Sequence, residues 1–382
     1  MTASGEKCRS PHRAPWVAMT TSTTPPPTTI RICRPGDLIA SVPGLLGFNP
    51  SRSLVVLCME GHPASRVGLV MRLDLPDPLR VDPDGEAALV EQISVLCSRR
   101  AAPAIIVIVV EDRAAGATPP HRELLAALRD ACEEVGTELL DAHVVDRVVA
   151  GARWRGYDEH DHRGGTLPDP QSSMVSAAHV AQGRVIHGAR EELDELLRRD
   201  PEPYLSRRAD LIGPALDAAL LARDTTGQRA VRHDLETVLA AVAQLNADEV
   251  LLDEEIARIG AALSDPLVRD ACFGLAVGEH VHAAERLWLQ LCRALPDPER
   301  AEAAVLVAYS CYVRGEGPLA GIALRAALTS MPGHRMANLL DSALSGGLPP
   351  EVLRDLADTA LGIAAELGVA LVPSTPRPPA AE

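Results

Sequence analysis

Lysine is nearly absent from this sequence. Of the 37 side chains counted as Lys or Arg, only Lys7 is a lysine, and it lies in an N-terminal stretch with little to bury. A phosphate-loop NTPase needs a loop lysine, a protein kinase needs a strand lysine on the α- and β-phosphates, and a pyridoxal enzyme needs a Schiff-base lysine. The sequence therefore excludes these three enzyme classes from its folded regions.

Basic residues as a whole are outnumbered, because 52 acids face 37 bases and the formal net charge is −15. Binding to nucleic acid requires basic side chains that neutralise phosphates, so we expect no nucleic-acid partner unless a local arginine patch escapes this average.

Long apolar runs and paired cysteines are also lacking. The longest apolar run, from Ala101 to Val110, is too short to span a bilayer, and no signal-peptide pattern opens the chain. The eight cysteines form no C-x-x-C pair, and several lie on apolar faces of predicted elements. We therefore expect a cytoplasmic protein without membrane contact, and the sequence leaves its oligomeric state open.

The 382 residues, 47% of them apolar, predict two globular domains with tails. Residues 1–29 and 370–382 are rich in Pro, Ser or Thr and should be disordered. Residues 163–189, which begin with a Gly- and Pro-rich stretch, are predicted to be a linker and connecting segment. Met19 offers a second possible start, so the sequence leaves open whether translation begins at Met1 or Met19.

Residues 30–162 are predicted to form an α/β domain with a mixed, partly parallel sheet. A two-turn helix should begin at Pro35 and end at Pro43 and Gly44, and a second helix should be capped at Thr118. The predicted strands are Leu54–Met59, Val67–Leu75, Ala104–Val110, Leu139–Val149 and Ala152–Tyr157. Because a helix separates Ala104–Val110 from Leu139–Val149, these two strands should run parallel.

Residues 190–369 are predicted to be all-helical, because helical periodicity replaces strand patterns there. A weak repeat has a spacing of 36 positions. Its first copy is Ala284, Trp288, Leu291 and Pro296, and its second copy is Ala320, Leu324, Ala327 and Pro332. Small, large and apolar residues followed by proline are typical of the second helix of a tetratricopeptide-like pair. Ordinary antiparallel helix packing would produce the same pattern, so both interpretations stay open.

Possible catalytic residues lie where the predicted strands end. Glu111 and Asp112 follow one strand, and Asp146 and Arg147 end another. Ligands of parallel sheets bind beyond the carboxyl ends of the strands, where paired carboxylates can hold a metal or act as acid and base. Acids are also common at strand ends simply because strands end at the surface.

Possible metal ligands gather in the stretch from Asp158 to His162. Asp158, His160 and His162 could bind a divalent ion, with His143 from the preceding strand as a further imidazole. The spacing matches no known metal motif, so a solvated polar loop is the favoured interpretation. No cofactor is predicted beyond this possible ion.

Four stretches of the chain resemble one known family. They are similar to the domain of unknown function 4192, a family of high-GC, actinobacterial-type bacteria. The first stretch begins at Arg34 and reads R-P-G-D-L-I-A-S-V-P-G-L-L-G-F-N-P-S-R-S-L-V-V, and the other three are Gly151–Tyr157, Ala284–Trp288 and Pro332–Arg335. The resemblance covers nearly the whole chain after Thr29 and implies no activity. Members of that family carry cysteines after the matching W-x-x-Y, and their absence here weighs against a metal site.

Two hypotheses about function follow. The first is a non-enzymatic interaction or regulatory protein that binds another protein through its helical domain, since no reactive constellation is present. The alternative is a metal- or small-molecule-binding enzyme, hydrolase-like, with its site at the strand ends of the α/β domain.

Overall fold

The computed structural model describes residues 17–20, 29–61, 64–76, 83–112, 119–157 and 164–373. It divides into two compact units, Met1–Ile186 and His187–Glu382, each of which is described by itself. Within the described residues no helix is both long and apolar enough to cross a bilayer.

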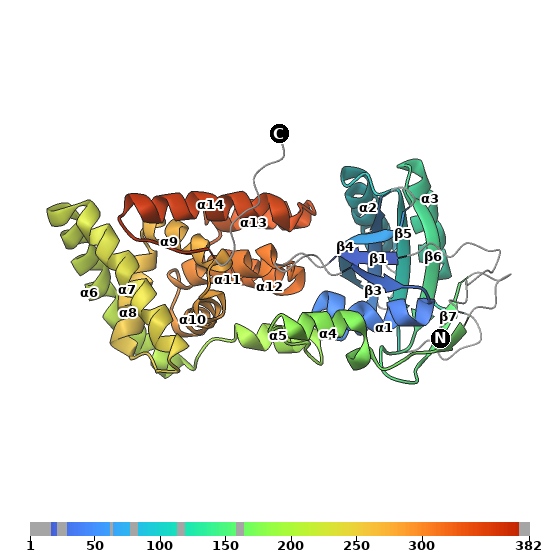
Figure 1. Ribbon diagram of the computed structural model, residues 1–382, viewed down its shortest axis with the longest axis horizontal. Helices are drawn as coiled ribbons and strands as arrows, with labels where there is room; N and C mark the ends of the chain where they lie inside the picture. Colours follow the sequence, from blue (N-terminus) through green and yellow to red (C-terminus); the bar gives the residue numbers. More distant parts are fainter. Residues whose placement is uncertain are drawn as a thin grey trace, which may run out of the picture. The chain divides into compact units, whose positions relative to one another are not determined.

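The first unit contains a mixed eight-stranded sheet in the order β2-β1-β4-β3-β5-β6-β7-β8 (Figure 1). The strands are β1 (Val17–Thr20), β2 (Thr29–Ile32), β3 (Ser53–Glu60), β4 (Arg66–Asp74), β5 (Ala104–Val110), β6 (Glu138–Val145), β7 (Arg153–Gly156) and β8 (Gly164–Thr166). β5 and β6 run parallel, whereas β3–β4, β3–β5 and β6–β7 are antiparallel pairs. The predicted mixed sheet, with parallel pairing of the two strands around the helix, is therefore confirmed.

Helices cover both faces of this sheet. α2 (Pro83–Arg99) and α3 (Arg122–Glu134) pack on one face, where Val109 and Val144 belong to the same core. α1 (Pro35–Leu46) packs on the other face, where a Cβ at Gly36 would lie 3.1 Å from Nε1 of Trp154. β5 and nearly all of β3 are buried on both faces, as their continuous apolar runs predict.

The predicted end of α1 is wrong. The helix continues through Pro43 and Gly44 to Leu46, and Gly47 caps it with a φ of 78°. Gly44 instead allows close packing of two helices. A Cβ there would lie 2.8 Å from the backbone nitrogen of Ser176, a residue of α4 (Met174–Ala181). The absence of a side chain lets α4 approach α1 closely.

Replacement of Gly44 by Val should therefore lower the free energy of unfolding by about 1–3 kcal/mol, because the backbone near Ser176 must move. Urea denaturation of both proteins measures this. Gly213→Val is the comparison, since a Cβ there meets nothing within 4 Å. Gly213 also lies inside a helix, so this variant measures the effect of valine on the helix alone. An unchanged midpoint for Gly44→Val would contradict the packing role.

The ends of the first unit differ from the sequence prediction. The segment 163–189, predicted as a linker, contains β8, a short 3₁₀ helix (Pro170–Ser172) and α4, and α4 packs on α1. Part of the predicted N-terminal tail forms β1, which pairs with β2 and β4. The rest of residues 1–28 lies outside the described residues.

The second unit is helical throughout its described residues, apart from one isolated bridge between Gly278 and Pro373. This bridge pairs the first residues of the predicted C-terminal tail, whose remainder from residue 374 is outside the described part. The helices are α5 (Arg190–Leu196), α6 (Glu202–Thr226), α7 (Gln228–Asn246), α8 (Asp253–Leu263), α9 (Pro266–Cys272), a 3₁₀ helix (Phe273–Val277), α10 (Val281–Ala294), α11 (Arg300–Val313), α12 (Gly317–Ser330), α13 (Arg335–Ser345) and α14 (Pro350–Glu366).

α11 is the central helix of this unit. All of its residues except Glu302 are buried, and it packs against α10, α12, α13 and α14. Tyr309 on α11 stacks its ring 4.6 Å from that of Phe273, and Trp288 on α10 is also fully buried. The few aromatic residues of the chain therefore contribute to its cores.

Candidate functional site

Glu111 lies at the carboxyl end of the parallel pair β5–β6. Its backbone N–H donates to the carbonyl of Val145 at 2.9 Å, so the ladder continues one residue beyond β5. Its side chain is almost completely buried, and Oε2 lies 3.4 Å from Nε2 of His121. A carboxylate has thus been placed next to an imidazole at the edge where parallel sheets bind their ligands.

His121 holds an unusual backbone conformation. It is the N-cap of α3, with φ 57° and no side-chain cap, and the predicted cap Thr118 lies outside the described residues. Left-handed φ values are uncommon for residues other than glycine, and they often mark functional sites.

Tyr157, which follows β7, completes this group. Its hydroxyl donates to the carbonyl of Pro120 at 2.7 Å, directly before His121. Burial raises the pKa of Tyr157, the charges of Arg155 and Arg122 oppose that rise, and Glu111 adds to it. We call Glu111, His121 and Tyr157 the strand-end cluster. A carboxylate beside an imidazole, with a neutral phenol and two guanidinium groups nearby, can in principle exchange protons and bind an anion.

The other three predicted strand-end residues do not contact this cluster in the described structure. Asp112 and Arg147 are exposed. The carboxylate of Asp146 accepts a hydrogen bond from the backbone N–H of Arg147 at 2.8 Å, which stabilises its own turn. Of the four predicted residues, only Glu111 therefore belongs to the strand-end cluster.

His143 lies on the opposite face of the sheet from Glu111. It pairs with Ile108, whereas its neighbour Val144 pairs with Val109 in the core beneath α2 and α3. Its Nε2 lies 3.4 Å from Asp141, and its ring meets that of Trp154 edge-on at 5.2 Å. His143 is thus a buried core histidine. Its predicted metal partners Asp158, His160 and His162 lie outside the described residues.

A hollow of about 890 Å³ lies beside the strand-end cluster, and we call it the arginine hollow. It is formed by the end of β6, the turn that follows, and the hairpin of β7 and β8. Its lining residues are Val144, Val145, Asp146, Arg147, Val149, Ala150, Gly151, Ala152, Arg153, Trp154, Arg155, Gly164, Gly165 and Thr166. Two of the predicted residues, Asp146 and Arg147, therefore border a concave surface.

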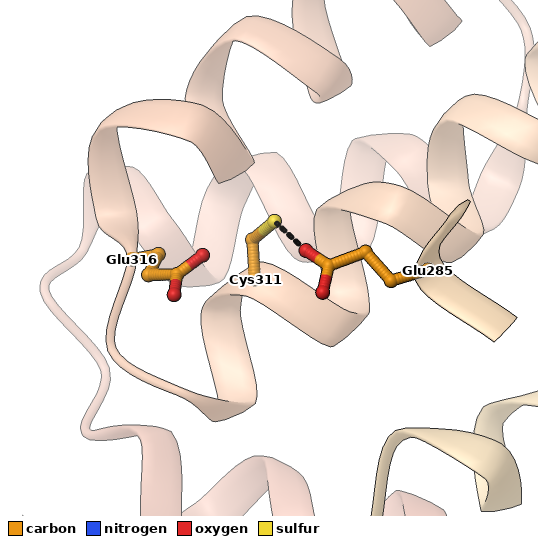
Figure 2. A group of neighbouring side chains, drawn as sticks. All are labelled: Glu285, Cys311 and Glu316. Atoms are coloured by element: carbon orange, nitrogen blue, oxygen red, sulfur yellow. Dashed lines mark hydrogen bonds between the residues drawn. The ribbon is translucent and has the colours of Figure 1, made fainter. Parts of the chain in front are cut away.

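The second unit also brings potential metal ligands together. Glu285 of α10, Cys311 of α11 and Glu316, the N-cap of α12, have ligand atoms within 4.8 Å of one another, and no other group of the described residues meets this criterion (Figure 2). The Cys311 thiol lies 3.8 Å from the carboxylate of Glu285.

The geometry favours an ion-pair cluster over a metal site. Arg314 bonds both carboxylates, with Nη2 3.0 Å from Oε2 of Glu316 and in contact with Glu285. Burial, followed by the charge of Glu316, raises the pKa of Cys311 well above its usual value. A protonated thiol is a poor ligand, and the guanidinium already engages both carboxylates and offsets one of their two charges. Sequence reasoning missed this cluster because its members come from three helices.

Comparison with known proteins identifies a family. No curated protein and no solved structure matches the chain. A family model described as "Domain of unknown function (DUF4192)" matches residues 35–351. Because this match covers most of the 382 residues, the chain belongs to the DUF4192 family.

Proposed function

We propose that the helical second unit binds another protein and that the chain acts as a non-enzymatic interaction or regulatory protein. The observation that carries this proposal is a repeated pair of helices. α10 and α12 begin 36 residues apart, at Val281 and Gly317, and α11 and α13 begin 35 residues apart, at Arg300 and Arg335.

The side chains of the two copies also correspond. Ala284, Trp288 and Leu291 of α10 are buried, and so are their counterparts Ala320, Leu324 and Ala327 of α12. In both copies a proline, Pro296 or Pro332, follows two residues after the last helical residue. This supports tetratricopeptide-like pairs, a fold that commonly presents helices to protein ligands.

Exposed apolar side chains at the end of the array support a binding surface. Leu339 on α13 is 63% exposed, and Leu348 and Val352, at the start of α14, are also exposed. α13 itself buries only Ala337 and Leu340. Groups of exposed apolar side chains are typical of protein-interaction sites.

The experiment is affinity capture with the full-length chain, comparing wild type with the Leu339→Glu variant. We expect a partner that is recovered by the wild type to be lost with Leu339→Glu, because the new charge would have to be buried in the interface. Val250→Glu is the matched control, since Val250 is 82% exposed elsewhere in the same unit. Equal recovery by both variants would contradict binding at α13.

A second candidate function is small-molecule binding by the first unit, at the strand-end cluster and the arginine hollow. A hydrolase-like reaction on the bound molecule would belong to the same site. The buried contact between Glu111 and His121 favours it, because a carboxylate within reach of an imidazole can exchange a proton with it. The residues that would complete a divalent metal site at His143, namely Asp158, His160 and His162, lie outside the described residues.

We also propose a cytoplasmic location without a nucleic-acid partner. The seven cysteines among the described residues are free thiols, which supports a reducing compartment, and the net charge of −15 opposes binding to phosphate polymers.

A further inference from the structure

The arginine hollow is basic although the chain as a whole is acidic. Three of its lining residues are arginines, Arg147, Arg153 and Arg155, and Asp146 is the one acid among them. The Asp146 carboxylate accepts a hydrogen bond from the backbone of Arg147 at 2.8 Å, so part of its charge is engaged in the turn. The lining therefore carries a surplus of positive charge.

Two of these arginines have no carboxylate partner within the described part of the chain. Neither Arg147 nor Arg153 forms a salt bridge there, whereas Arg208 and Arg314 of the second unit each bind two carboxylates. Arg155 is close enough to Tyr157 to oppose the rise in its pKa. Arginines that line one hollow, two of them without a carboxylate partner among the described residues, are suited to an anion.

The rest of the lining consists mainly of apolar side chains and of glycines, at which backbone is exposed. Val144, Val149 and Ala150 provide apolar contacts. Gly164 lets β8 approach β7, since a Cβ there would lie 3.1 Å from the carbonyl oxygen of Trp154. A volume of about 890 Å³ lies within the range of small-molecule sites, and this mixed lining fits a ligand with one charged end and a less polar body.

We propose that the arginine hollow binds a soluble small molecule that carries a phosphate group, held by Arg147, Arg153 and Arg155. The proposal rests on the second candidate function, small-molecule binding by the first unit, and adds the chemical class of the ligand. A planar guanidinium donates two parallel hydrogen bonds to phosphate oxygens, and in this chain arginine is the only basic residue apart from Lys7 and histidine.

The test is isothermal titration of the full chain with phenyl phosphate, with phenol as the uncharged probe. We expect phenyl phosphate to bind, phenol to give no measurable heat, and the affinity for phenyl phosphate to fall as salt is raised. The double variant Arg147→Ala, Arg153→Ala should weaken binding at least tenfold. Both side chains are exposed, so its melting temperature should match the wild type.

Arg129→Ala is the matched control, because Arg129 is an exposed arginine of α3 in the same unit. It should change the affinity less than twofold. Absence of phenyl phosphate binding, or equal binding by the double variant, overturns the proposal. Co-sedimentation with phosphatidic-acid vesicles that the double variant loses would assign the phosphate to a lipid and also overturn it. An uncharged ligand bound equally by wild type and double variant would refute the phosphate class and leave small-molecule binding standing.

Discussion

Replacement of Arg314 by Met is expected to lower the free energy of unfolding by about 3–5 kcal/mol. The guanidinium lies between the carboxylates of Glu285 and Glu316, and all three side chains are at least four-fifths buried. Without it, two neighbouring carboxylates stay in a poorly solvated site and repel each other. Urea denaturation monitored by circular dichroism measures the loss, and Arg325→Met, at an exposed position of α12, should stay within about 0.5 kcal/mol of the wild type.

Zinc distinguishes the ion-pair interpretation from a native metal site. In Arg314→Met, the ligand atoms of Glu285, Cys311 and Glu316 remain within reach of a single ion. Added Zn²⁺ should therefore raise the melting temperature of the variant by mass action, and it should leave the wild type unchanged because Arg314 occupies the same space. Equal stabilisation of both proteins by Zn²⁺ would show that the native cluster binds metal.

The sequence was sufficient for the elements whose pattern is local. β3 and β5 are continuous apolar runs, and Gly136 ends α3 with a φ of 79°. The glycine at position 44 shows the limit of this reasoning. A glycine after a proline is typical of a helix end. Gly44, however, lies inside the helix, where its missing side chain leaves room for the backbone of Ser176, a residue far away in the chain. Only tertiary contacts distinguish a packing glycine from a helix stop.

The candidate site was only partly predictable for the same reason. Glu111 could be found because it directly follows a buried strand. His121 and Tyr157 could not, because the turn before α3 and the pairing of β6 with β7 bring them to Glu111. The side of the sheet on which His143 lies was also not predictable, since strand register decides which face a side chain occupies. A histidine in the first turn of the predicted helix and the W-x-x-Y stretch were the available signals.

Trp154 connects the arginine hollow to the rest of the first unit. Its side chain is 8% exposed, meets the ring of His143, and lies against Gly36 of α1 and Gly165 of β8, where added Cβ atoms would lie 3.1 and 3.2 Å from Nε1. Three elements, β6, β8 and the distant α1, therefore pack on one indole. Trp154 is also one of the residues that line the hollow.

Replacement of Trp154 by Ala should lower the free energy of unfolding by about 3–5 kcal/mol, because a large buried ring is lost and the glycines cannot fill the cavity. Trp154→Phe is the control and should lose less than half as much, since a phenyl ring keeps most of the packing. If the hollow depends on this packing, Trp154→Phe should also retain phenyl phosphate binding at temperatures where it is folded. A cost below about 1 kcal/mol for Trp154→Ala would show that β7 and β8 are held to α1 by other contacts.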